Sequence, residues 1–126
     1  KVTESFRAVV RAYRAWLEKD YDKVIRLSKD AWFIADQAKK KIDAALEKSF
    51  RVQWELAREI AEARKIIEGI GRLATGSIAN DLRVSLALLR GAWLGAFHTA
   101  KINVDYVHRP ALKKALMKKL QTTPKA

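Results

Sequence analysis

Apolar residues recur at three- and four-residue spacing along nearly the whole chain, which is the signature of amphipathic helices. The first such stretch contains Phe6, Val9, Tyr13 and Trp16 and predicts a helix that ends near Glu18. From residue 21 to residue 68 the same rhythm continues without a glycine or proline, so we expect a second, very long helix there. A bend near residue 49 stays open, because such a length exceeds that of most globular helices.

The only strong punctuation is the glycine-rich stretch 69–76, which predicts a turn between helices. It lacks the Gly-Lys-Ser/Thr ending of a phosphate-binding loop, and no strand pattern precedes it. A third helix is expected from about residue 78 to about residue 106, ending before Pro110. Residues 111–120 form a short amphipathic segment, and a loose tail follows. The pattern predicts an all-α fold, an antiparallel helical bundle of three to four helices with one very long helix and a short basic C-terminal helix. We expect one domain over residues 1–126, with a bundle at 1–107 and a basic segment at 108–126.

Charge is the most informative property of the composition. The chain carries 26 Lys and Arg against 14 Asp and Glu, a formal net charge of +12. Such an excess on a small body favours binding to polyanions. There is no cysteine, which excludes disulfides and thiolate chemistry. The many charges and few Asn, Gln and Met also indicate a hot environment. No apolar run is long enough to cross a bilayer. Because the chain starts with Lys1, we expect any leader to have been removed.

The basic residues are grouped rather than scattered. Residues 108–126 carry +6 of the +12, with six Lys and Arg and no acid. In the first helix three arginines share one face, and Lys39-Lys40-Lys41 forms a further basic spot. Forked guanidinium groups on a rigid helix suit phosphate recognition. We therefore predict nucleic-acid contacts for Arg7, Arg11, Arg14, Lys39, Lys40, Arg83, Arg90, Lys101, Arg109, Lys113, Lys114, Lys118 and Lys119.

Signals for catalysis are weak. His98 and His108 are ten residues apart, about 15 Å along a helix, and cannot bind one ion together. His98 lies in an apolar stretch and is expected to be a core or interface residue. The tryptophans Trp16, Trp32, Trp54 and Trp93 lie on or beside apolar helical positions, so core or interface packing is favoured over base stacking. We predict no catalytic residue, no metal, no cofactor and no small-molecule substrate.

One segment has a local resemblance. Residues 77–87, Ser-Ile-Ala-Asn-Asp-Leu-Arg-Val-Ser-Leu-Ala, are similar to the stretch that opens the last helix of PhoU-like phosphate-signalling domains, which are helical bundles. The resemblance implies a regulatory adaptor that acts through protein partners in the cytoplasm. Leu94, His98, Ser28 and Trp32 stand where that family places its acidic metal ligands, so no metal cluster is expected.

The overall character resembles a different class. Short, basic, cysteine-free and almost wholly helical chains are typical of the major coat proteins of filamentous DNA viruses of hyperthermophilic archaea. That resemblance implies a non-enzymatic structural protein that packages double-stranded DNA without sequence specificity. It also implies self-association or pairing with a related coat subunit, as a dimer within a filament, and a location in the virion after assembly in the host cytoplasm. The PhoU-like adaptor remains the alternative. Anchoring of residues 109–120 to an anionic membrane is a third, weaker possibility.

Overall fold

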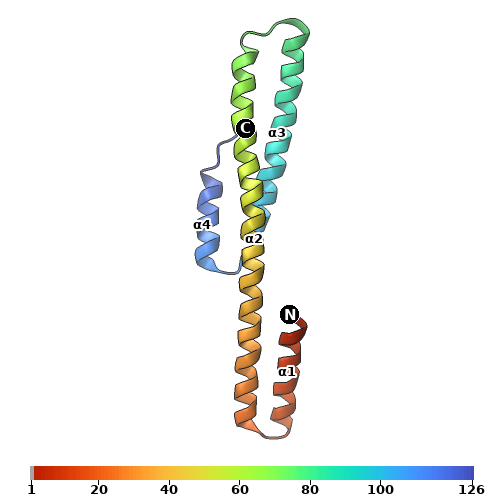
Figure 1. Cartoon of the computed structure of the whole chain (residues 1–126), viewed down its shortest axis with the longest axis vertical. Helices are drawn as coiled ribbons and strands as arrows, with labels where there is room; N and C mark the ends of the chain where they lie inside the picture. The colour runs from red at the N-terminus through yellow and green to blue at the C-terminus, as the bar shows by residue number, and fades with distance from the viewer. Residues whose placement is uncertain (1) are drawn as a thin grey trace. The chain divides into compact units, whose positions relative to one another are not determined.

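The computed structural model describes residues 2–126, with side chains from Thr3 onward, and in this range it contains helices and connections only. The helices are α1 (Val2–Leu17), α2 (Tyr21–Gly71), α3 (Gly76–Asp105) and α4 (Pro110–Gln121) (Figure 1). The all-helical class, the very long helix and the short basic C-terminal helix are therefore confirmed. The contacts divide the chain into two units, Lys1–Ala44 and Ala45–Ala126, each described here by itself. The prediction of one domain over residues 1–126 stays a prediction.

The first unit is a hairpin made by α1 and the beginning of α2. Their connection turns on Lys19, which has a positive φ of 60°. Asp20 then caps α2, because its Oδ1 accepts a hydrogen bond from the Lys23 backbone N–H at 3.2 Å. The tight connection and the Asp20 cap both agree with the sequence pattern.

The second unit packs the rest of α2 against α3 and α4. One buried cluster joins Phe50 of α2 to Ala100 and Val104 of α3 and to Leu116 and Leu120 of α4. A second cluster lies further along α2 and α3 and contains Ala57, Ile60, Ala61, Trp93 and Ala96. Helices α2 and α3 both supply buried residues to both clusters, so the contact between these two helices forms the core of this unit.

The glycine-rich stretch is a turn between helices, as predicted. Helix α2 ends at Gly71 and α3 begins at Gly76, whose φ of 65° is a left-handed conformation that favours glycine. Helix α2 runs without interruption from Tyr21 to Gly71, as the absence of a breaker before Gly69 predicts.

The C-terminal tail is not loose, which corrects the expectation from its composition. Thr123 is buried, and the indole Nε1–H of Trp54 donates to its Oγ1 at 3.0 Å. The indole Nε1–H of Trp93 donates to the carbonyl oxygen of Pro124 at 2.9 Å. Two tryptophans from different helices thus bind successive residues of the tail, and this holds residues 122–126 against the second unit.

Candidate functional site

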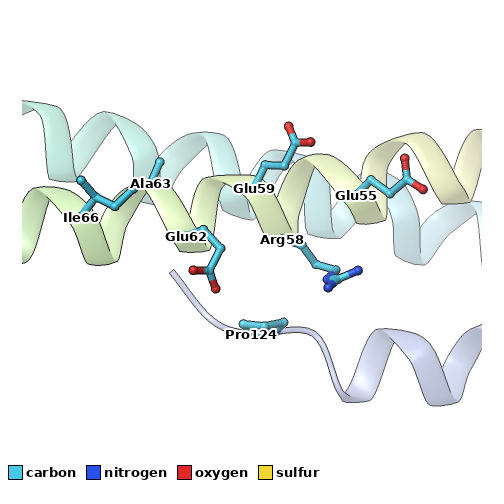
Figure 2. A pocket seen from close by; sticks show the side chains of 7 residues that line it. All are labelled: Glu55, Arg58, Glu59, Glu62, Ala63, Ile66 and Pro124. Atoms are coloured by element: carbon cyan, nitrogen blue, oxygen red, sulfur yellow. The ribbon is translucent and has the colours of Figure 1, made fainter.

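A hollow lined by both acidic and basic side chains lies where the tail crosses α2. It is a hollow of about 530 Å³ lined by one face of α2 and by Pro124 (Figure 2). This volume lies within the usual range of small-molecule sites, about 300–1,000 Å³. The α2 lining follows helical spacing and consists of Glu55, Arg58, Glu59, Glu62, Ala63 and Ile66. Since the tail forms one wall, the tryptophan contacts that hold the tail also shape the hollow.

Opposite charges face the tail within this hollow. Figure 2 shows Arg58 and Glu62 extending from α2 toward the tail, whereas Glu55 and Glu59 extend the other way across the helix. The Arg58 guanidinium lies over the Trp54 ring, 4.8 Å from its centroid, and this contact orients it. Glu62 pairs with Lys65 at 3.0 Å, but both side chains are 65% exposed, so the pair is weak and replaceable.

These groups suit a ligand that carries both polar hydrogen donors and an acid. A carboxylate accepts two parallel N–H bonds from an amidine or an aminopyrimidine edge, and a guanidinium binds a carboxylate in the same paired manner. Ala63, Ile66 and Pro124 supply the apolar surface that a flat ring would contact. The arrangement can therefore bind a ligand with a flat nitrogen-rich ring and a carboxylate.

A second hollow lies on the outer face of α4. It is lined by Lys113, Lys114, Lys118, Gln121, Met117 and Pro110. Lys113 is half-buried, and its Nζ donates to the carbonyl oxygen of Asp105 at 3.2 Å, whereas Lys114 and Lys118 are exposed. Around the thioether of Met117 these lysines form a positive, partly apolar surface, which suits an anionic group attached to an apolar body.

The structure brings together only some of the predicted contact residues. Twelve of the thirteen are exposed and Lys113 is half-buried. Arg7, Arg11 and Arg14 line one hollow on α1, and Arg83 shares a hollow at the α2–α3 turn with Arg72 and Glu68. Lys40 pairs with Asp36 at 3.4 Å, and the Lys119 ammonium lies over the Trp54 ring. The remaining predicted residues line none of the hollows described here; they are Lys39, Arg90, Lys101 and Arg109. Their assignment to a ligand stays a prediction.

Several residues behave differently from their sequence pattern. His98 is exposed with its ring edge toward Phe97, so it is not a core residue. Trp54 and Trp93 pack in the second unit as expected, but Trp16 and Trp32 are 55% and 75% exposed. Asp43 was not singled out, yet it is fully buried, and it does have an interaction partner. Its position beside three lysines in the sequence is typical of a solvated face and gave no signal of burial.

Within residues 2–126 no group of three or more His, Asp and Glu side chains is arranged to hold a metal ion. None of the helices in the same range is both long and apolar enough to cross a membrane.

The helices and the hollow beside the tail define an all-α domain with a polar surface hollow. The comparison with known families is more specific: residues 3–122 match the model of the formiminotransferase-cyclodeaminase family. Because the match covers nearly the whole chain, the chain belongs to this family. No curated protein and no solved structure matches it.

The family corrects the functional predictions made from the sequence. The chain is neither a filamentous-virus coat protein nor a PhoU-like adaptor, and the packaging of double-stranded DNA, a coat-subunit partner and a virion location lose their basis. The reason is physical. Net positive charge favours any anion and does not distinguish DNA from a small acidic ligand, and a similarity over eleven residues of one helix covers too little of the chain to define a family. The proteins of this family are enzymes. The prediction of a non-enzymatic protein therefore concerns only this segment, which contains no catalytic residue that the sequence identifies.

Proposed function

We propose that this chain is a substrate-binding domain of a folate-metabolising enzyme of the formiminotransferase-cyclodeaminase family. The observation that carries the proposal is the family match over residues 3–122. The hollow between α2 and the tail is the proposed place of contact with the folate.

The chemistry of folates fits the groups in this hollow. A folate has a flat nitrogen-rich ring with N–H donors at one edge and a glutamate with carboxylates at the other end. In the proposed mode Glu62 accepts hydrogen bonds from the ring edge, and Ile66 and Pro124 contact the ring face. Arg58 binds a carboxylate, and it is already oriented by its contact with Trp54.

The proposal assigns binding to this segment and bond making and breaking to the complete enzyme. Acid–base catalysis is most effective where closure excludes water from the reacting groups. The glutamates of the hollow are exposed, which suits recognition better than proton transfer.

The test is titration of the full chain with 5-formyltetrahydrofolate, a stable folate, followed by calorimetry and tryptophan fluorescence. Because Trp54 lies under Arg58, its emission should change on binding. We expect Arg58→Gln to weaken binding by about tenfold, which is about 1.4 kcal/mol. The matched control is Arg51→Gln, since Arg51 lies on the same helix, outside the lining of the hollow, and pairs with Glu47 at 3.7 Å.

Two results would contradict this function. If the wild-type chain binds no folate at millimolar concentration, the domain is not a substrate-binding one. If the chain alone releases ammonia from a formimino-folate, the division between binding here and chemistry elsewhere is wrong, and the hollow must then be studied as an active site.

A further inference from the structure

The two sides of helix α1 have different surroundings. One side carries alanines and is buried, at Ala8, Ala12 and Ala15. Phe6 lies two residues before Ala8, which places it about 200° around the helix and so on the opposite side. Val10 has the same relation to Ala12. The outer side of α1 therefore carries apolar side chains that take no part in its buried contact.

Three arginines form a stripe between these two sides, called here the arginine stripe. Arg7, Arg11 and Arg14 follow one another at spacings of four and three residues, so they share one face of α1 over about 10 Å of its length. With Phe6 and Val10 they line a hollow of about 400 Å³. Positive charge bounds this hollow on one side and apolar surface on the other. Its volume lies in the range of small-molecule sites.

The positive charges of the arginine stripe are not used within the described part of the chain. No hydrogen bond or ion pair there engages any of the three guanidinium groups. Glu4 and Glu18 stand at the two ends of the stripe, but neither lines the hollow. Helix α2 differs, because several of its cations pair with an acid three or four residues away; they are Lys40, Arg51, Arg64 and Lys65.

We propose that this hollow binds a nucleoside triphosphate, with the phosphates on the arginine stripe and the base against Phe6. A triphosphate concentrates several negative charges in a short chain, and forked guanidinium groups bind phosphate oxygens through paired N–H donors. The arginines lie in a row along α1, which suits a chain of phosphates better than a single one. Like charges at four-residue spacing repel each other on a helix, and a bound polyanion removes this repulsion.

The apolar side of the hollow accounts for the rest of the ligand. Nucleobases stack on aromatic side chains through a flat face that every base has, so such a contact favours a base without selecting one. Phe6 is 67% exposed and precedes Arg7 directly, so its ring is open to a base whose phosphates lie on the stripe. This inference does not depend on folate binding, because the folate hollow lies on α2 and the tail, in the second unit.

The test is isothermal titration calorimetry of the full chain with ATP, at low salt and without magnesium, which would neutralise part of the phosphate charge. We expect Arg11→Gln to raise the Kd of ATP about tenfold. Arg11→Lys should raise it about threefold, because lysine keeps the charge but lacks the fork. Arg11 is exposed, so both variants should keep their helical circular dichroism.

The matched control is Arg26→Gln. It removes the same charge from another exposed arginine of the first unit, which lies on α2 and outside the hollow. We expect it to change the Kd of ATP by less than about twofold, because an exposed charge at a distance is screened.

Two further ligands separate the contribution of the base from that of the phosphates. Tripolyphosphate should bind about fivefold more weakly than ATP, because it has no ring to contact Phe6. Phe6→Ala should weaken ATP to the same degree and leave tripolyphosphate unchanged. Adenosine, which has no phosphate, should bind more weakly than either.

Three results would overturn the proposal. The first is no binding of ATP at millimolar concentration. The second is equal weakening by Arg26→Gln and Arg11→Gln, which would attribute the attraction to the net charge of +12 and not to this hollow. The third is equal affinity for tripolyphosphate and ATP, which would make inorganic polyphosphate the ligand. Arg11→Gln should not change the affinity for 5-formyltetrahydrofolate, and Arg58→Gln should not change that for ATP, so the two proposals fail separately.

Discussion

At the scale of single residues, Trp93 shows how one donor can order a tail that composition marks as loose. Its ring is 93% buried between α2 and α3, since 7% remains exposed, and its Nε1–H binds the Pro124 carbonyl oxygen at 2.9 Å. We expect Trp93→Phe to remove this bond and to lower the free energy of unfolding by about 2 kcal/mol, counting the lost donor and part of the ring. Urea denaturation measures the change.

The same substitution should release the tail, and hydrogen exchange can report this. Amides of residues 122–126 should exchange faster in Trp93→Phe, whereas helix α1 should not change. Trp16→Phe is the control, because Trp16 is 55% exposed and lies on α1, in the first unit. Equal stability of wild type and Trp93→Phe would show that the tail is held by other contacts.

The sequence predicted which residues share a helical face, but not which face would be buried. Periodicity places all four tryptophans, Trp16, Trp32, Trp54 and Trp93, on apolar stripes. Of these four, Trp54 and Trp93 pack in the buried clusters, whereas Trp16 and Trp32 are exposed. Burial depends on what lies opposite a stripe, and a period contains no information about the neighbour. The burial of Asp43 was missed for a related reason, because the burial of an acid depends on its surroundings in the fold and not on its neighbours in the sequence.

At the scale of the helices, two glycines of α3 separate the effect of helix propensity on stability from the effect of backbone geometry. Gly91 lies inside α3, where an added Cβ would meet nothing within 4 Å, whereas Gly76 begins α3 with a positive φ of 65°. We expect Gly91→Ala to stabilise the chain by about 0.5–1 kcal/mol, because alanine restricts the unfolded chain and favours the helix. Gly76→Ala should destabilise it by about 1 kcal/mol, because a left-handed conformation strains alanine.

Thermal unfolding of both variants beside the wild type measures this contrast. A destabilised Gly91→Ala would mean that another surface approaches the α3 backbone closely at that point.

The existence of the helices, the turn at residues 69–76 and the final helix were all predictable from the sequence, because they follow from the spacing of apolar residues and from helix-breaking residues. The candidate site was not predictable from the sequence, because its hollow forms where the tail crosses α2. The position of the tail depends on two indole hydrogen bonds, and no sequence motif indicates them.

At the scale of the whole molecule, the charge excess misled because it was treated as evidence for one partner. A net charge of +12 sets the sign of the ligand and the strength of long-range attraction, but it carries no shape. The family match moves the expected anion from a nucleic-acid backbone to a small acidic substrate. The same lysines of α4 can attract either, so only binding experiments with a defined ligand separate them.

The contrast between the two units predicts a graded stability along the chain. The second unit buries Phe50, Trp93, Val104, Leu116 and Leu120, whereas the first unit closes through alanines. Local opening needs less free energy where few large apolar groups are buried. In dilute solution, hydrogen exchange should therefore be faster for residues 5–35 than for residues 50–104. Equal protection of the two ranges would show that the alanine contact of the first unit is as stabilising as the large buried side chains of the second.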